Sequence, residues 1–116
     1  MEELGLRKAQ EVVDRWIEEV GVRYFHPVTN TAILAEEVGE VAHIVVRKWG
    51  EQSFKTEEEE ERAHEQLGEE LADVLFVLLC LSNQLGVDLE EAFRRRMDKK
   101  TARDRDRHKN NPKLRD

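Results

Sequence analysis

The chain has 116 residues, about the size of one domain, and its charged and hydrophobic shares are equal at 39%. A chain this short and polar can build only a small core, so burial between subunits is expected. Its 19 basic and 26 acidic residues give a net charge of −7, which argues against binding to polymeric nucleic acid, because such binding needs clustered positive charge. The single cysteine excludes an internal disulfide. Without a signal pattern or an apolar stretch of about 18 residues, we expect a cytoplasmic protein with no membrane partner.

The first predicted element is a helix with one apolar stripe that ends at Gly21. Its apolar residues recur at steps of three and four, which is the period of a helix that packs on one side. The stripe consists of Ala9, Val12, Val13, Trp16, Ile17 and Val20. It predicts that Trp16 belongs to the core. A connector from Val22 to Val28 follows, and it carries two aromatic residues, Tyr24 and Phe25.

The second predicted helix runs to about Trp49, before Gly50. Thr29 or Asn30 can cap its start, because both side chains accept hydrogen bonds from the free N–H groups of a first turn. Glycine after the last periodic residue is a common end of a helix. The segment therefore predicts one long helix with acidic residues in its middle.

The third predicted helix begins near Thr56 and ends at Leu85, before Gly86. Thr56 and Glu59 have the spacing of a capping box, in which each side chain accepts a hydrogen bond from the backbone N–H of the other residue at the start of a helix. The pattern is compatible with a bend near Gly68. The whole segment is long enough to carry both an acidic start and an apolar end.

The apolar end of this third helix is hydrophobic on every side. Residues 74–81 read VLFVLLCL, and a helix without a polar face must be surrounded by other protein. We expect a second subunit to cover what the other short helices leave open. Cys80 lies in this run and is predicted to be a buried, unreactive thiol.

The last predicted helix opens at Asp88, which forms a second candidate capping box with Glu91. No segment of the chain alternates with period two, so no sheet is predicted. We therefore predict an all-α fold of four to five helices. One helical domain is expected over residues 1–104, followed by a charged, mobile tail over residues 105–116.

Four carboxylates lie on or beside the faces of the second and third predicted helices that point toward the core. At about 100° per residue, Glu37 and Glu40 fall on the apolar side of the second helix. Glu70 lies inside the apolar stripe of the third helix, and Asp73 lies at its edge. Acidic groups on a packing face are unfavourable unless a cation balances them, and Mg²⁺ or Mn²⁺ prefers such oxygen ligands. The alternative interpretation of such acidic patterns is a helix face exposed to solvent. We adopt that interpretation for the run Glu57–Glu61.

These carboxylates also carry a resemblance to a known family. The segments EEVGE at 36–40 and ELAD at 70–73 resemble the EExxE…ExxD signature of the MazG-like nucleotide pyrophosphohydrolases, in the all-α NTP pyrophosphatase superfamily. The similarity runs from about Tyr24 to His108, and it looks closest to the short stand-alone bacterial members. It implies a MazG-like helical bundle that is completed by oligomerisation, as a homodimer or a homotetramer.

The resemblance implies a function as well. It predicts Mg²⁺-dependent hydrolysis of (deoxy)nucleoside triphosphates to monophosphate and pyrophosphate, with Mn²⁺ as a substitute metal and removal of unwanted nucleotides as a role. Glu37, Glu40, Glu70 and Asp73 would be the metal ligands. Glu36, or a ligating glutamate such as Glu37, would help to activate water.

Candidate substrate-binding residues lie outside the acidic segments. The cations Lys99 and Arg103 share one helix face at a spacing of four residues, and Lys100 and Arg107 are nearby. A solvated basic helix end is the alternative interpretation of these four. The aromatic residues that could stack on a base are Trp16, Tyr24, Phe25 and Trp49. Of these, Phe25 and Tyr24 are favoured, because they precede the helix that carries the first acidic segment.

Two other function classes stay open at this point. Glu40-x-x-His43 matches half of the pattern in carboxylate-bridged di-iron bundles, although the partner segment ends in Asp73. A non-catalytic helical adaptor would explain the surrounded helix but not the paired acids. Hydrolysis of a panel of triphosphates separates these classes.

Overall fold

The computed structural model describes residues 3–115, and these residues form helices and connecting segments without a β-strand. The main elements are α1 (Leu6–Trp16), α2 (Pro27–Lys48), α3 (Glu57–Gln84) and α4 (Leu89–Asp104). A π-helix (Ile17–Gly21) extends α1, and a short 3-10 helix (Pro112–Leu114) follows α4. The predicted all-α fold is confirmed.

Local side-chain caps fix the starts of α3 and α4 where the sequence predicts them. Thr56 Oγ1 accepts a hydrogen bond from the Glu59 N–H at 3.2 Å, and Asp88 Oδ1 accepts one from the Glu91 N–H at 3.1 Å. Both bonds satisfy donors that a first helical turn leaves free. At the other end of α3, Gly86 has a positive φ of 68°, which glycine adopts without steric cost.

The predicted cap of α2 at Thr29 or Asn30 is wrong, because the helix begins earlier. His26 occupies the cap position, and its Nδ1 accepts a hydrogen bond from the Val28 N–H at 3.1 Å. Pro27 is the first helical residue. Proline suits that position because its φ is already helical and it has no N–H that needs a partner.

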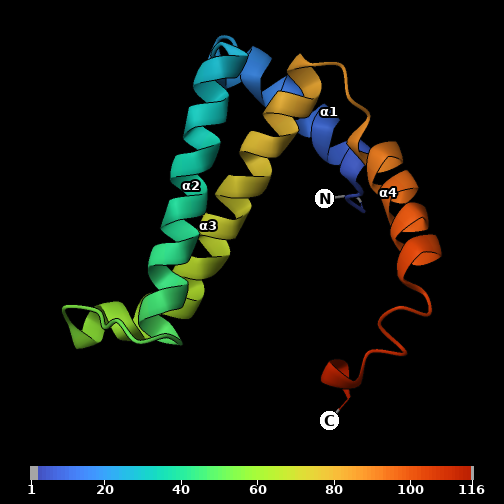
Figure 1. The fold of residues 1–116 in the computed structure, drawn as a ribbon. Helices are drawn as coiled ribbons and strands as arrows, with labels where there is room; N and C mark the ends of the chain where they lie inside the picture. Colours follow the sequence, from blue (N-terminus) through green and yellow to red (C-terminus); the bar gives the residue numbers. More distant parts are fainter. Residues whose placement is uncertain (1–2, 116) are drawn as a thin grey trace.

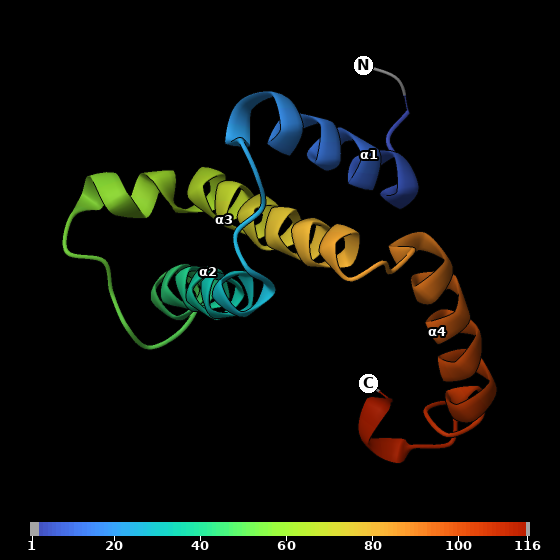
Figure 2. The ribbon, with the colours of Figure 1, turned by 90° about the horizontal axis from the view of Figure 1, so that it is seen from above.

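The connector between α1 and α2 contains a strained backbone. Val22 has φ 73° and ψ −57°, and the Arg23 N–H donates to the Gly21 carbonyl at 2.9 Å, which together define a γ-turn. A β-branched residue rarely adopts a positive φ. Figure 2 shows the connector crossing α3 on its way from α1 to α2. The turn thus redirects the chain across the helix that both neighbours contact.

The helices form an open arch. In Figure 1, α2 and α3 run side by side as one arm, α4 forms the opposite arm, and α1 lies between them at the top. α2 packs along α3, α1 packs on α3, and α4 contacts α1. The first turns of α3, drawn in green, run at an angle to its remainder, so this helix bends in its N-terminal part. The radius of gyration is 18.0 Å, against about 13 Å for a compact chain of this length.

Few side chains are buried in this arch. One cluster joins α1 and its π-helical extension to α3, and Tyr24 and Leu89 pack against it. Ile44 and Ala63 are buried where the other ends of α2 and α3 meet. The cluster between α1 and α3 consists of Ala9, Val13, Ile17, Leu79 and Cys80. The core therefore lies at two places along α3, with a less covered stretch between them.

The apolar run at residues 74–81 is only partly covered within one chain. Leu75 and Leu78 are 41% and 38% exposed, because α1 and α2 occupy only part of the surface of α3. Cys80 is 3% exposed, and burial raises the pKa of its thiol to about 11. The predicted burial of the thiol is confirmed, and its low reactivity stays a prediction that the raised pKa supports.

The end of α4 at Asp104 coincides with the predicted boundary between the helical domain and the tail. Turns and the 3-10 helix follow it, and the mobility of the tail stays a prediction. Among the described residues, no single helix is long and apolar enough to cross a membrane. Only α3 and α4 taken together, across a bend of 105°, meet that length and composition.

Candidate metal centre

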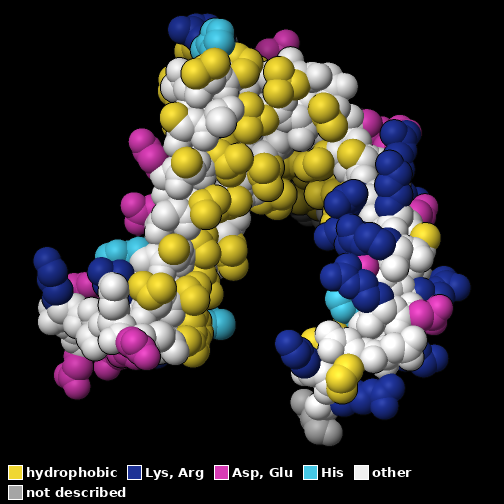
Figure 3. Space-filling model, viewed as in Figure 1, with side chains coloured by type: hydrophobic (Ala, Val, Ile, Leu, Met, Phe, Trp, Pro, Cys, Tyr) yellow, Lys and Arg dark blue, Asp and Glu magenta, His cyan; other side chains and the backbone are white. Residues whose placement is uncertain are grey.

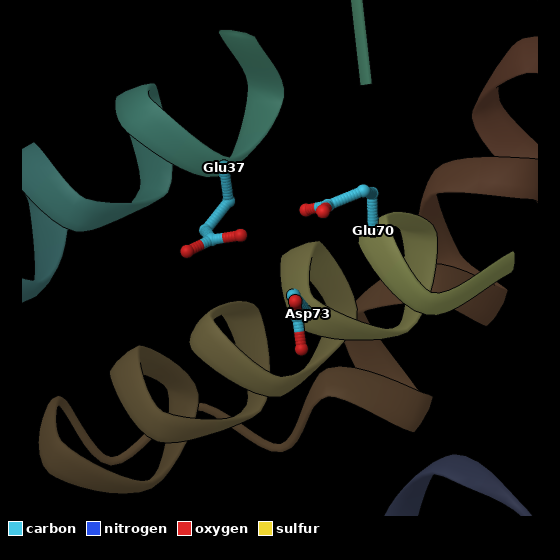
Figure 4. Close-up of side chains that lie close together, drawn as sticks. All are labelled: Glu37, Glu70 and Asp73. Carbon is cyan, nitrogen blue, oxygen red and sulfur yellow. The ribbon is translucent and has the colours of Figure 1, made fainter. Parts of the chain in front are cut away.

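Carboxylates from α2 and α3 meet between the two helices. Glu37 projects from α2, and Glu70 and Asp73 project from α3 (Figure 4). One oxygen atom from each of these three side chains lies within 4.8 Å of the other two. Glu37 and Glu70 are half-buried, whereas Asp73 is exposed. We refer to Glu37, Glu70 and Asp73 as the acidic cluster.

The spacing of the acidic cluster is close to that of a divalent-cation site. Mg²⁺ binds oxygen ligands at about 2.1 Å in an octahedron, so two of its ligands lie about 3 to 4 Å apart. The 4.8 Å limit exceeds this range by about 1 to 2 Å, which a change of side-chain rotamer can close. All donors are hard carboxylate oxygens, the type that Mg²⁺ and Mn²⁺ prefer. The three side chains therefore fit a hard divalent cation.

The acidic cluster disfavours its own negative charge. Partial burial raises the pKa of Glu70, and the charges of Asp73, Glu37 and Glu40 raise it further, together with a hydrogen bond to Glu37. A bound cation would act in the opposite direction and favour the ionised carboxylates. The raised pKa thus marks a group of charges that the protein alone does not balance.

The other two acidic residues of the EEVGE segment lie on the surface of α2. Glu40 is exposed, and it affects Glu70 through its charge, but it is not one of the three side chains whose oxygens meet. Glu36 is also exposed, next to Glu37 in the chain. The structure therefore brings together three of the four predicted ligands and leaves Glu40 about one helical turn away.

His43 lies outside the acidic cluster. Its ring faces Phe54, with the ring centroids 6.5 Å apart. Among the described residues, the clustered ligands include no histidine. Since a Glu-x-x-His di-iron centre needs the imidazole beside the carboxylates, the geometry does not support that alternative.

A mostly apolar cavity of about 360 Å³ adjoins the acidic cluster, and Glu37 and Asp73 form part of its wall. The rest of the wall comes from the end of α1, the connector, α2 and α3. Small-molecule sites commonly combine an apolar cavity of this size with a few polar groups. The carboxylates therefore stand at one side of a space large enough for an organic ligand.

Both favoured aromatic candidates, Phe25 and Tyr24, lie in the wall of this cavity. Phe25 is 59% exposed. The Tyr24 hydroxyl donates to Asp14 at 2.8 Å and accepts from Asn83 at 2.9 Å, so its ring is held in place. Burial and the hydrogen bond to Asp14 raise the pKa of Tyr24 to about 12, which keeps the hydroxyl protonated.

Trp16 lies in the cavity wall and not in the core. It is 47% exposed, and its ring meets that of Phe76 edge to face, with the centroids 5.7 Å apart. The apolar stripe of α1 predicts a core position, but the stripe is wider than the surface that α3 covers. Trp49, the fourth aromatic candidate, is not part of the cavity wall.

The four predicted substrate-binding cations lie apart from the acidic cluster. Lys99, Lys100 and Arg103 belong to α4, on the opposite arm of the arch (Figure 1), and Arg107 follows that helix. None of the four lies in the cavity wall. Arg103 donates two hydrogen bonds to Asp104, at 2.7 and 2.9 Å, and Arg107 donates one at 3.3 Å. The bonds from Arg103 above all lower the pKa of Asp104 to about 2.

Sequence reasoning does not single out three other residues of the cavity wall, Arg23, Asn30 and Phe76. A signal for one of them exists in the sequence. Asn30 lies seven residues before Glu37, which is two helical turns, so both share one face of α2. Arg23 and Phe76 carry no such signal, because their place depends on how the connector and α1 cross α3.

Comparison with known proteins identifies a family for this chain. Residues 25–108 match the MazG nucleotide pyrophosphohydrolase domain. The chain is 41% identical to the YpjD protein of Bacillus subtilis over 107 residues. This aligned region covers 92% of this chain and 93% of that protein. It is similar to the crystal structure of YpjD from Bacillus subtilis, with a TM-score of 0.72 and 40% identity, over 85% of this chain and 97% of the other. It is also similar to that of a Bacillus-conserved MazG protein, a nucleotide pyrophosphohydrolase, with a TM-score of 0.67 and 38% identity, over 85% and 92%.

The fold and the matched region define an all-α nucleotide pyrophosphohydrolase. The protein belongs to the MazG family, and the matched region contains the acidic cluster. The family resemblance carried by EEVGE and ELAD is thus confirmed. Its predicted extent, from about Tyr24 to His108, agrees with the matched residues.

Proposed function

We propose that this protein hydrolyses (deoxy)nucleoside triphosphates to the nucleoside monophosphate and pyrophosphate, with Mg²⁺ as the metal and Mn²⁺ as a possible substitute. One observation carries the proposal. The acidic cluster, which fits a hard cation, stands beside an apolar cavity of nucleoside size. A nucleoside triphosphate has the same division, since its charge is at one end and its base is at the other.

Glu37, Glu70 and Asp73 are proposed to hold the metal, and Glu40 is proposed to complete the set by a change of rotamer. A bound divalent cation would neutralise phosphate charge and polarise the bond to be broken. Glu36 or Glu37 is proposed to accept the proton of the attacking water. The oxygen of that water forms a bond to the α-phosphorus while the bond from that phosphorus to the leaving pyrophosphate breaks.

A second copy of the chain is proposed to cover the inner face of the arch. Figure 3 shows hydrophobic side chains gathered on that face over α2 and α3, and Lys and Arg side chains gathered over α4. Half-exposed apolar residues are present on each of these helices, among them Val38, Leu71 and Phe93. An exposed apolar surface of this extent marks an interaction site. A homodimer or homotetramer would bury it.

The same assembly would bring cations to the acidic cluster. Lys99, Lys100, Arg103 and Arg107 do not line the cavity of their own chain, and among the main helices α4 packs mainly against α1. A triphosphate beside the carboxylates needs positive charge that the cluster cannot supply. We propose that α4 of a second copy supplies it, so that each site uses both chains.

The biological role proposed here is the removal of unwanted nucleotides in the cytoplasm. A non-catalytic adaptor is less well supported, because an adaptor needs neither clustered carboxylates nor a cavity beside them. The family to which the chain belongs is also one of pyrophosphohydrolases.

A substrate panel tests the proposed function. The protein is incubated with each common ribo- and deoxyribonucleoside triphosphate in Mg²⁺ or in EDTA, and the products are separated by anion-exchange chromatography. Monophosphate and pyrophosphate in equal amounts, formed only with metal, are expected. Release of orthophosphate and diphosphate would contradict the proposed bond choice, and no turnover would leave the adaptor.

A further inference from the structure

The cavity beside the acidic cluster has two chemically different ends. Its wall on α2 runs from Asn30 to Glu37, and its wall on α3 runs from Asp73 to Cys80. Each stretch contains eight residues, or about 10 Å of helix between its first and last residue. Because α2 and α3 are antiparallel (Figure 1), Glu37 and Asp73 share one end, and Asn30 and Cys80 share the other.

Asn30 is the buried polar group at the end away from the carboxylates. It is 5% exposed, and its Nδ2 donates to Gln84 Oε1 at 2.9 Å. Gln84 Nε2 in turn donates to the backbone carbonyl of Phe25 at 2.5 Å. Two side chains and one backbone group thus form a relay from the connector, through α3, to the cavity.

The relay fixes the orientation of the Asn30 amide. A backbone carbonyl can only accept, so Gln84 must turn its NH₂ group toward Phe25 and its oxygen toward Asn30. Asn30 must then turn its own NH₂ group toward Gln84. Its Oδ1 is left as an acceptor whose direction cannot be exchanged with that of the nitrogen without breaking a hydrogen bond.

The oxygen of Asn30 is left without a hydrogen-bond partner from the described residues. Among the described residues, no hydrogen bond to Asn30 Oδ1 is formed, and no side-chain oxygen there is both fully buried and without a partner. Solvent must therefore reach Oδ1. The open space that Asn30 lines is the cavity.

Aromatic rings flank the route from the carboxylates to this oxygen. Trp16 and Phe76 form an edge-to-face pair in the wall, and Tyr24 and Phe25 line it from the connector. Flat rings of this kind provide a surface on which any nucleobase can stack, because every base has a π face. A single oriented acceptor beside them adds a direction to that surface.

We propose that Asn30 Oδ1 accepts a hydrogen bond from an amino or imino N–H on the base of the substrate, which makes Asn30 a specificity-determining residue. The proposal rests on the proposed function and adds the part of the substrate that the cavity receives. The phosphates lie at Glu37 and Asp73, and the edge of the base lies two helical turns away. A base without a donor at that edge leaves Oδ1 unsatisfied, which reduces kcat/KM by about 10- to 100-fold.

The test combines a protein variant with a substrate analogue. The best substrate of the panel is compared with an analogue that lacks one donor of the base, such as purine riboside triphosphate for ATP or N3-methyluridine triphosphate for UTP. The wild-type protein is expected to prefer the natural base by at least about 10-fold. Asn30→Leu has nearly the same shape without the amide, and it is expected to lose this preference mainly through KM.

Two controls separate this inference from other effects. Asn110→Leu makes the same change at an exposed asparagine that does not line the cavity, and it should retain the preference. Inorganic tripolyphosphate, which has no base, should inhibit the wild type and Asn30→Leu with the same inhibition constant. Circular dichroism verifies that each variant is folded.

Each outcome has a separate meaning. Loss of preference in Asn30→Leu, with unchanged inhibition by tripolyphosphate, supports the role of Asn30. A wild-type protein that hydrolyses every analogue as fast as its natural partner overturns that role, whether or not the variant folds, and leaves the proposed function standing. A protein that hydrolyses no triphosphate overturns the proposed function itself and the inference with it.

Discussion

Both arms of the arch consist of regular helices, but the helices differ in how many of their side chains are buried. α3 buries several side chains against α1 and α2, whereas α4 buries none. α4 still has a capping residue and exposed ion pairs, such as Arg95 with Glu91 at 2.6 Å, which stabilise a helix locally. Its Phe93 and Met97 are 56% and 45% exposed. Local signals thus form this helix, but they do not supply an apolar partner for it.

The comparison extends to charge. The arm of α2 and α3 gathers carboxylates that repel one another, and the arm of α4 gathers cations, several of which pair with acidic residues close to them in the chain. Arg7 links the start of α4 to α1 through Asp88 at 2.9 Å and Glu90 at 3.2 Å, which are solvent-accessible pairs of small energetic value. In the proposed assembly, the cations on α4 of a second copy would approach the carboxylates between α2 and α3.

The largest effect is expected from the acidic arm. Glu70→Gln removes a charge from the centre of the cluster and should reduce kcat by more than about 100-fold, because even groups that only orient a metal ligand contribute 10- to 100-fold. Activity with Mg²⁺ is measured next to light scattering, which should report an unchanged assembly. Glu69→Gln, the exposed neighbour in the chain, is the matched control. A fully active Glu70→Gln protein would contradict the assignment.

The next effect tests whether the arms of different chains cooperate. Lys99→Ala combined with Arg103→Ala should reduce kcat/KM by about 10- to 100-fold, since charge-assisted contacts to phosphate are lost. Mixing this variant with Glu70→Gln after mild unfolding and refolding should restore about a quarter of wild-type activity, because half of the dimers are mixed and one of their two sites is intact.

Arg94→Ala, on another face of α4, is the control for this experiment and should remain active. If the mixture stays as inactive as its components while light scattering shows mixed assemblies, the cations do not act on the site of another chain.

A smaller effect is expected on stability when metal binds. Mg²⁺ at about 100 times its dissociation constant should stabilise the folded state by about 2.7 kcal/mol, because it balances the charges of the acidic cluster. The melting temperature, followed by circular dichroism in EDTA and in Mg²⁺, measures this. Glu37→Gln should abolish most of the shift, whereas Glu36→Gln should retain it. An equal shift in both variants would place the ion elsewhere.

The smallest effect concerns pH in the absence of metal. The pKa of Glu70 is raised above its ordinary value of 4.5, so the folded state binds this proton more tightly than the unfolded state does. The resulting stabilisation is complete below pH 4.5 and is lost as the pH rises through the raised value. In EDTA, the melting temperature of the wild type should therefore fall more steeply over this range than that of Glu70→Gln. Identical slopes would show that the cluster does not hold the proton.

Part of this structure follows from short stretches of sequence. Thr56 and Asp88 are identified as caps because a cap depends only on the next three residues. The same rule fails at Asn30, because the first turn is instead set by His26 and Pro27. Where a proline and a later asparagine can both begin a helix, local signals do not decide between them.

The candidate site is predictable to the extent that it depends on helical register. Glu37, Glu70 and Asp73 are found because their spacing puts them on packed faces, and register alone does not tell that Glu40 stays outside the close group. The cavity is not predictable in this way. Its wall depends on how α1 and the connector cross α3, which brings Trp16 to Phe76 across about 60 residues of chain.

The open arch has a consequence for how the protein withstands heat. A single chain with so few buried side chains derives little free energy from its own interior, so association and folding would become one equilibrium in the proposed assembly. Its melting temperature should then rise with protein concentration, and dilution should lower it. In such an assembly, measurements on different variants would be comparable only at one shared concentration, and the abundance of the protein in its host would become a determinant of its lifetime.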